Sequence, residues 1–369
     1  MNQRVVVTGA TGNVGSAVVQ SLLRDPDVAS ITGVARRSPQ WPPGDGRRET
    51  DRLQWVSADV ATDALDVVAN SDVVIHLAWQ IQPVRDERHL HRVNVDGTQR
   101  VMDAVVAHGV KRLVVASSVG AYAAATDSTP VDESWPPTGI EASVYSRQKA
   151  AVERRLDAFE LIHPEVSVVR MRTSLVFARR AAAEIARFFL GPLVPSSWIG
   201  RGALPVLPFP DDVTFQAVHA DDAADAYRRA ALGDVTGPFN IAAAPVLGPA
   251  DLAAALDARH VTVPRRLLHT GAAVSHALRV QRTSPGWLDL AFNAPTMDIG
   301  RAHRELGWQA RHPAGDALAE LVAGLASRAG ADTAPLRPGH HGACDPLDMR
   351  PHRRADDDTD TITNHEERP

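Results

Sequence analysis

Two residues of uncommon type in this chain stand four positions apart near its middle. Tyr145 and Lys149 bound the sequence Tyr-Ser-Arg-Gln-Lys, and a four-residue spacing places both side chains on one face of a helix. The only other lysine is Lys111. A tyrosine with an unperturbed pKa of about 10 works as an acid–base catalyst only when a neighbouring cation lowers that pKa. The pair predicts proton transfer at a carbonyl or alcohol; the alternative is an exposed helix pair without chemistry.

Two serines at the end of a predicted strand are candidates for a third catalytic group. Leu113–Ser117 is predicted to form a buried strand, and Ser118 follows it. Ligands in open α/β sheets lie beyond the carboxyl ends of the strands. A hydroxyl there can polarise a substrate oxygen by hydrogen bonding. We favour Ser118 for this role. For Ser117, a role in capping or packing is the alternative.

A glycine-rich turn near the N-terminus separates a predicted strand, Arg4–Thr8, from a predicted helix. Its three glycines recur every third residue, which suits a tight turn, close approach of a pyrophosphate and close helix-on-strand packing. The helix N-terminus would then face the phosphate charge. A glycine turn without a ligand is the alternative. The predicted dinucleotide contacts in this turn are Gly9, Thr11, Gly12, Asn13, Val14 and Gly15.

The end of the second predicted strand bears on the choice between NAD and NADP. Ala35 stands where an acid would bind the ribose of NAD, and Arg36 and Arg37 follow it. Two guanidinium groups can pair with a 2′-phosphate, which mildly favours NADP, although they can also simply solvate a loop. Asp59 and Val60, after the third strand, are predicted near the adenine. Asp59 can equally cap a helix.

Short apolar runs alternate with helical stretches through the first half of the chain, which predicts an α/β fold with a parallel sheet covered on both faces. We expect a dinucleotide-binding domain over 1–172, a smaller substrate-binding lobe over 173–330 interleaved with returning elements, and a disordered tail over 331–369. A long loop is expected over Gly191–Pro210 and a closing helix over Asp298–Trp308. The predicted strands are Arg4–Thr8, Ser30–Val34, Leu53–Ser57, Val73–Leu77, Leu113–Ser117 and Val166–Arg170.

The composition excludes several other classes of protein. Hydrophobic residues make up 44% of the chain and the formal charge is -5, so we expect a globular protein without nucleic-acid or membrane partners. No apolar run reaches the roughly 18 residues of a membrane span and no signal segment precedes the first strand, which favours the cytoplasm. Cys344 is the only cysteine, so no disulfide is expected. A metal site is not expected either, because the tail residues His340, His341, Cys344 and His352 fit a solvated segment better.

Taken together, the motifs and their order resemble the extended short-chain dehydrogenases/reductases, the NAD-dependent epimerase/dehydratase family, over about residues 1–325. The resemblance implies a Rossmann-type doubly wound sheet, a small-molecule substrate and a homodimer. The matching stretches are Thr8–Gly15, His76–Ala78, Asn94–Thr98, Ser117–Tyr122, Tyr145–Lys149 and Val218–Asp222.

Several residues take expected roles from this resemblance. Tyr145 matches the general acid/base, Lys149 the lysine that binds ribose and lowers the tyrosine pKa, and Ser118 the serine that polarises the substrate. Ala78 matches a position lining the cofactor, and Asn94 one near it with a largely structural role. At a further landmark, His219 and Asp221, a structural role is at least as well supported as a substrate contact.

Two departures from the family pattern concern the substrate. Members that act on sugar nucleotides usually carry an asparagine shortly after the sixth strand, where Thr173–Phe177 has none, and an arginine where this chain has Phe215. We therefore expect hydride transfer between nicotinamide and a carbonyl or secondary alcohol. The alternatives are a sugar-nucleotide epimerase or dehydratase, and a dinucleotide-sensing protein without catalysis. Residues 178–215 are expected to form an apolar pocket wall.

Overall fold

Alternating side chains on the first strand show how the sequence builds a three-layer fold. A computed structural model describes residues 2–39, 51–81, 86–125, 127–189, 206–278 and 284–338. On the first strand, Val5 and Val7 belong to one buried cluster and Val6 to another, because successive side chains of a strand point to opposite faces. The strand is therefore buried on both faces, as expected for a parallel sheet between two helical layers.

The main sheet of the described chain has seven strands, in the order β10-β6-β5-β4-β1-β2-β3, and every neighbouring pair is parallel. The chain order reverses between β1 and β4, which makes the carboxyl ends of these strands the usual ligand-binding edge. The strands are β1 Gln3–Thr8, β2 Val28–Ala35, β3 Leu53–Ser57, β4 Val73–His76, β5 Arg112–Ser118, β6 Ser167–Thr173 and β10 Gly237–Ile241. Each of the six predicted strands is confirmed to within three residues at either end.

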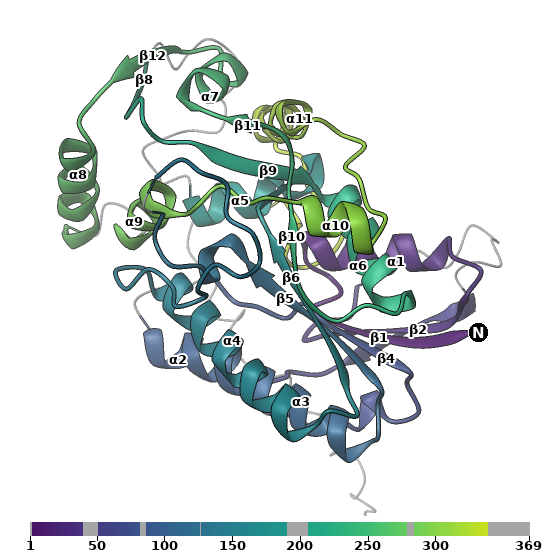
Figure 1. The fold of residues 1–369 in the computed structure, drawn as a ribbon. Helices are drawn as coiled ribbons and strands as arrows, with labels where there is room; N and C mark the ends of the chain where they lie inside the picture. The colour runs from purple at the N-terminus through teal and green to yellow at the C-terminus, as the bar shows by residue number, and fades with distance from the viewer. Residues whose placement is uncertain are drawn as a thin grey trace, which may run out of the picture. The chain divides into compact units, whose positions relative to one another are not determined.

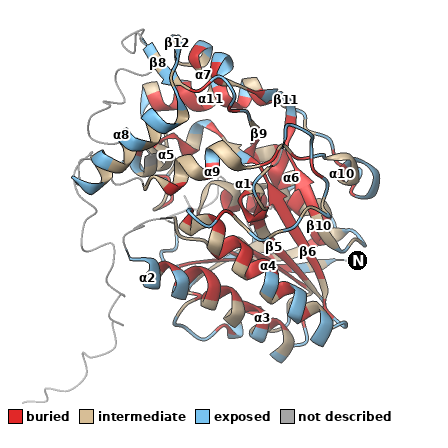
Figure 2. Ribbon diagram, turned by 60° about the vertical axis from the view of Figure 1, so that its left-hand side comes forward, coloured by how far each residue is buried: buried red, intermediate tan, exposed pale blue. Residues whose placement is uncertain are grey.

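Helices cover both faces of this sheet (Figure 1). On one face, α1 (Asn13–Leu23) packs against α6 (Ala220–Leu232), and on the other lie α3 (Gly97–Ala107) and α4 (Val144–Ile162). The buried residues are concentrated in the strands and in the helix faces turned toward them (Figure 2). This confirms the doubly wound fold expected from the sequence.

The second half of the chain adds two smaller sheets and further helices. The sheets are β11-β9-β7 and the pair β12-β8, while β10 and α6 return to the main sheet. The elements added here are β7 Leu175–Phe177, α5 Ala182–Phe189, β8 Val206–Phe209, β9 Phe215–His219, β11 Ala243–Leu247, α7 Pro249–Ala255, β12 Arg259–Thr262, α8 Arg265–Ala277, α9 Gly286–Asn293, α10 Gly300–Glu305 and α11 Ala314–Ser327; α2 Glu87–His91 lies in the first half, before α3.

Two expectations for this half are corrected. Within the predicted loop over Gly191–Pro210, residues 206–209 form strand β8 and pair with β12. Residues 190–205 lie outside the described residues. The boundary of the predicted tail at 331 is too early. Leu336 is fully buried, and Thr333 Oγ1 donates a hydrogen bond to the Thr11 carbonyl at 2.8 Å, so these residues belong to the fold.

The other expected features of this half are borne out or untested. The closing helix is confirmed as α10, with Trp308 completely buried behind it. The tail histidines and Cys344 lie outside the described residues, so a solvated tail remains a prediction. In the part of the chain that the structure describes, no helix is long and apolar enough to cross a membrane.

Candidate active site

The start of α4 places Tyr145 at the carboxyl edge of the main sheet. Ser143 is the N-cap of α4, and its side chain accepts a hydrogen bond from the Ser146 backbone N–H at 3.4 Å. The Ser146 hydroxyl donates to the Gly120 carbonyl at 2.6 Å, in the turn after β5. These contacts fix the first turn of α4 beside the end of β5, where the predicted serines lie.

The phenol ring of Tyr145 is enclosed by backbone and aromatic rings. A Cβ on Gly120 would lie 2.9 Å from Tyr145 Cε1, so only glycine lets the backbone approach the ring this closely. Burial raises the pKa of Tyr145, and a side-chain hydrogen bond with Ser118 lowers it. The structure brings the predicted acid/base and the predicted polarising serine together.

Lys149 lies one turn further along α4, where its ammonium group contacts backbone and an indole. Its Nζ donates to the Ala116 carbonyl on β5 at 2.7 Å and lies 3.4 Å from the centroid of a Trp79 ring. Burial lowers the pKa of Lys149 to about 7, and the charge of Glu153 raises it. The Nζ is 5.8 Å from the Tyr145 ring centroid. Burial and Ser118 act on the Tyr145 pKa, whereas the lowering expected from Lys149 is not seen; the lysine Nζ contacts the Ala116 carbonyl and the Trp79 ring instead.

The two serines at the end of β5 have different partners. The Ser117 hydroxyl donates to Glu153, which is completely buried, whereas Ser118 Oγ accepts the Gly120 backbone N–H at 3.0 Å and faces Tyr145. Ser117 is therefore held in the packing between β5 and α4. This arrangement favours Ser118 for the polarising role, as the sequence suggested.

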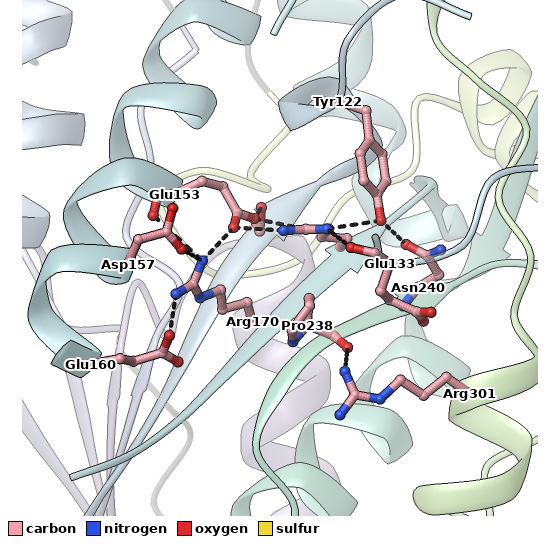
Figure 3. Close-up of polar contacts among 11 residues, drawn as sticks. Tyr122, Glu133, Glu153, Asp157, Glu160, Arg170, Pro238, Asn240 and Arg301 are labelled. Carbon is pink, nitrogen blue, oxygen red and sulfur yellow. Dashed lines mark hydrogen bonds and ion pairs between the residues drawn. The ribbon is translucent and has the colours of Figure 1, made fainter. Parts of the chain in front are cut away.

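Behind Lys149, a buried network of charges joins α4 to β6 (Figure 3). Glu153 Oε2 accepts hydrogen bonds from Arg172 at 2.9 Å and from Arg170 at 3.0 Å, and all three side chains are at most 4% exposed. Arg172 also donates to the Tyr122 hydroxyl at 3.0 Å, and that hydroxyl donates to Asn240 Oδ1 on β10 at 2.7 Å. The network fixes the register of α4 across three strands; nothing in the sequence patterns pointed to it.

The glycine turn has the geometry that a dinucleotide phosphate requires. Gly9 has a φ of +69°, and a Cβ there would lie 2.6 Å from the Ala78 backbone nitrogen. A Cβ on Gly15 would lie 2.2 Å from the Gly9 carbonyl oxygen, so α1 and β1 approach as closely as predicted. Gly12 is the N-cap of α1, and no side chain among the described residues caps that helix. The first N–H groups of α1 are therefore available to an anion.

Other residues of the turn also fit a ligand. Asn13 donates from Nδ2 to the Val176 carbonyl at 3.1 Å, while its buried Oδ1 has no partner among the described residues. Thr11 is buried, and Val14 is half-buried on α1. An unpaired buried acceptor in a binding turn can be satisfied by a ligand donor.

The residues predicted at the adenosine end lie after neighbouring strands. Arg36 and Arg37 follow β2 and are exposed, whereas Val60 is buried. The Asp59 carboxylate accepts the Ala61 backbone N–H at 2.9 Å, so it closes a turn; no helix begins there, and Asp59 is not the helix cap that the sequence allowed as an alternative.

Two further predicted positions lie beside the glycine turn and beside α4, respectively. Ala78 follows β4 and is half-buried against Gly9. Asn94 is buried; its Oδ1 accepts the Gln80 backbone N–H at 2.7 Å and its Nδ2 donates to Gln148 Oε1 at 2.8 Å. Asn94 therefore holds the loop after β4 against α4, which is a structural role.

The family landmark at the start of α6 is also built into the structure. His219 Nδ1 accepts the Asp221 backbone N–H at 3.2 Å, and its other ring nitrogen contacts Glu320 Oε2 at 3.1 Å. Asp221 pairs with Arg180 at 2.9 Å. These contacts join α6 to α11 and to the turn before α5.

A pocket opens beside Tyr145, and sequence reasoning missed most of its wall. Trp79, after β4, meets the Tyr145 ring edge-on with centroids 5.9 Å apart, and Trp287 on α9 lies at 5.1 Å with a tilt of 36°. Much of the remaining lining is formed by Ile81, Leu90, Ser143, Val144 and Gln148. No described residue of 178–215 lines this pocket; residues 190–205 lie outside the described residues, so for them the expected wall stays a prediction. Trp79 directly follows Ala78, a signal that was available, whereas nothing local marked Trp287.

Comparisons with known proteins found similar sequences and a similar fold. The chain is 27% identical over 332 residues to an uncharacterized protein of Mycobacterium tuberculosis, covering 89% of this chain but only 30% of that relative. It is 37% identical over 117 residues to an L-arabinose 1-dehydrogenase (NAD(P)+) of Haloferax volcanii, covering 31% of this chain and 41% of the relative. The structure of MoeE5 in complex with UDP-glucuronic acid and NAD has a TM-score of 0.66 and 24% identity, covering 88% and 99% of the two chains; this likeness shows the fold.

The family model covers the glycine turn, Ser118, Tyr145, Lys149 and the landmark at His219. It is described as the NAD dependent epimerase/dehydratase family and matches residues 5–242. The chain therefore belongs to the NAD-dependent epimerase/dehydratase family, a family of enzymes with an NAD-binding Rossmann fold.

Proposed function

We propose that this enzyme is an NAD(P)-dependent oxidoreductase that interconverts a carbonyl and a secondary alcohol, with Tyr145 as the general acid/base. The observation that carries the proposal is the placement of the Tyr145 phenol against Ser118, at the carboxyl end of β5 and in the wall of a pocket. Lys149 lies one helical turn away on the same face of α4. The uncapped start of α1 lies at the same edge of the sheet, two strands from β5.

The residues of the chain supply the acid–base part of such a reaction. The bound dinucleotide would supply or accept the hydride at carbon. In the reducing direction, the Tyr145 hydroxyl gives its proton to the carbonyl oxygen, and in the oxidising direction the phenolate takes the alcohol proton. Ser118 donates a hydrogen bond to the same oxygen and stabilises its developing negative charge. Lys149 would hold the ribose hydroxyls of the dinucleotide.

Replacing Tyr145 by phenylalanine tests the proposed proton donor. Tyr145→Phe is expected to lower kcat by about 10²–10⁴-fold, the usual contribution of a positioned acid–base group, while dinucleotide binding stays nearly unchanged. Steady-state kinetics and a thermal shift with the dinucleotide measure the two effects. Tyr227→Phe on α6 makes the same chemical change outside the pocket and should retain activity. Full turnover by Tyr145→Phe would refute the assignment.

Epimerisation or dehydration of a sugar nucleotide is the second candidate. MoeE5 was solved with UDP-glucuronic acid and NAD, which supports it. The absence of asparagine from Thr173–Phe177 and the presence of Phe215 speak against it. Nicotinamide absorbance separates the two functions, because only the oxidoreductase consumes cofactor in proportion to product. A dinucleotide sensor would show binding without turnover.

We also propose a mild preference for NADP, supported by the two exposed arginines after β2. A guanidinium–phosphate hydrogen bond contributes about 1.5–3 kcal/mol, so Arg36→Ala combined with Arg37→Ala is expected to weaken NADP binding by about tenfold or more relative to NAD. Titration calorimetry with both dinucleotides measures this ratio. Arg24→Ala, which removes an exposed arginine at the end of α1, is the control. Equal losses for NAD and NADP would contradict the preference.

A further inference from the structure

The ammonium group of Lys149 is enclosed by its neighbours. Lys149 is 3% exposed, and its Nζ donates to the Ala116 carbonyl at 2.7 Å and lies 3.4 Å from the centroid of a Trp79 ring. A hydrogen bond to a ribose hydroxyl requires the nitrogen and the oxygen to approach within about 3.2 Å. A ribose can therefore reach this Nζ only after one of the groups that cover it has moved.

Of these two groups, the indole of Trp79 is the one that can move while the sheet stays intact. Ala116 lies inside β5, opposite Met171 of β6, so its carbonyl is fixed by the sheet. Trp79 lies after the end of β4, and a change of its side-chain rotamer breaks no strand pairing. The Tyr145 ring is too distant to be the main cover, because its centroid is 5.8 Å from Nζ.

The Trp79 indole also lacks the hydrogen bond that fixes other indoles of this protein. Trp135 Nε1 donates to the Ala123 carbonyl at 3.3 Å. Trp308 Nε1 donates to the Asp222 carbonyl at 2.9 Å. Trp79 Nε1 is buried and has no partner among the described residues, which is an unfavourable state for a donor. Leaving this position therefore costs the Trp79 indole no hydrogen bond and allows its N–H to find a partner.

We propose that Trp79 is a gate on Lys149: its indole leaves the lysine Nζ when the dinucleotide binds, and a ribose hydroxyl of the dinucleotide takes its place. The gate rests on the proposed function, which gives Lys149 the ribose. Because binding must first break the contact between the ammonium and the ring, the closed indole lowers the affinity for the dinucleotide.

Lysine NMR observes the gate directly, since the chain has two lysines, Lys111 and Lys149. In the full chain with carbon-13-labelled lysine, the ε-CH₂ signal of Lys149 should lie upfield of that of Lys111, because the ring current of Trp79 shields it. Lys111→Arg assigns the two signals. Saturation with NAD or NADP, followed by calorimetry on the same sample, should move the Lys149 signal downfield. A Lys149 signal that keeps its upfield position in the dinucleotide complex would overturn the gate.

Removal of the ring should strengthen dinucleotide binding. Trp79→Leu is expected to bind the dinucleotide about threefold to thirtyfold more tightly than the wild type, the equivalent of the cation–π contact that binding no longer has to break. Trp79→Phe keeps a ring that can cover the ammonium and should stay within about twofold of the wild type. Trp135→Leu is the matched control, because it removes an indole that contacts the Ala123 carbonyl instead of Lys149.

Thermal melting of each variant separates loss of fold from a change in binding. Equal or weaker dinucleotide binding by folded Trp79→Leu would refute the gate, and so would absence of binding by both this variant and the wild type. Failure of the proposed function has a different signature: the Lys149 signal moves when the dinucleotide binds, but no carbonyl compound or alcohol changes the nicotinamide absorbance.

Discussion

Burial sets the chemistry of individual side chains at this site. The pKa of Lys149 falls to about 7 because its ammonium is enclosed between the Ala116 carbonyl and the Trp79 ring, with Glu153 as the acid that opposes the shift. A lysine with that pKa can exchange its charge near neutral pH, unlike an exposed lysine. The same enclosure raises the pKa of Tyr145. The acid–base properties of the site therefore depend on what covers these two residues.

The buried side chain of His76 makes the stability of the protein depend on pH. It lies at the end of β4, where its ring contacts Thr8 Oγ1 at 2.7 Å and Thr98 Oγ1 at 3.0 Å, and burial lowers its pKa to about 3. The unfolded chain binds a proton at this residue below pH 6.5 or so, while the folded protein does not. The contribution of His76 to stability is thus complete above that pH and falls as the pH drops toward 3.

Denaturant unfolding at several pH values measures this effect. The free energy of unfolding is expected to fall below pH 6.5 by up to about 1.4 kcal/mol per pH unit from this residue. His76→Asn should be less stable at pH 7 and have a flatter pH dependence. The same substitution at exposed His303 should leave the slope unchanged. A wild-type slope in His76→Asn would contradict the assignment.

At the scale of elements, the position of α4 depends on buried charge. Glu153 lies one turn beyond Lys149 and accepts hydrogen bonds from Arg170, Arg172 and Ser117. A helix held in this way keeps Tyr145 and Lys149 in register with the end of β5. Removing one partner of a buried ion pair is costly, because the remaining charges lose their compensation.

Glu153→Gln tests the contribution of this network. We expect a loss of about 3–5 kcal/mol in the free energy of unfolding and a further fall of the Lys149 pKa, because the carboxylate that raises it is gone. With two lysines in the chain, carbon-13 labelling of the lysine side chains gives two titrating NMR signals that report this pKa. Asp157→Asn is the control: this carboxylate pairs with Arg170 at 2.6 Å but is 61% exposed, so we expect a loss of at most about 1 kcal/mol. An unaltered Lys149 pKa in Glu153→Gln would disprove the coupling.

At the scale of the whole molecule, residues beyond α11 return to the dinucleotide turn. Thr333 donates to the carbonyl of Thr11, and Leu336 is completely buried. The C-terminal part of the described chain therefore supports the loop that would hold the phosphates. A fold boundary drawn from composition alone missed this contact, since Pro and Arg around it resemble a solvated segment.

Leu336→Ala measures how much the packing of residues 331–338 contributes to the stability of the fold. Truncating a fully buried leucine typically costs about 2–5 kcal/mol, so the melting temperature should fall, and dinucleotide affinity should fall with it. Leu267→Ala removes the same atoms from a side chain that is 63% exposed on α8 and should change stability by less than about 0.5 kcal/mol. Equal stabilities of the two variants would show that residues 331–338 are not part of the folded unit.

The sequence by itself determined the features whose signals are local. The strand periodicity, the glycine turn and the pairing of Tyr145 with Lys149 each lie within a few residues of one another, so spacing alone predicted the sheet, the dinucleotide turn and the acid–base pair. The sequence suggested Ser118 rather than Ser117 as the serine that polarises the substrate. The structure supports this choice because the Ser117 hydroxyl is held by Glu153, which lies on α4 and not on the strand of the two serines. Only the tertiary structure placed Trp287 beside Tyr145 and Thr333 beside Thr11. These contacts join residues far apart in the chain, and their energy comes from burial that exists only once the layers have packed.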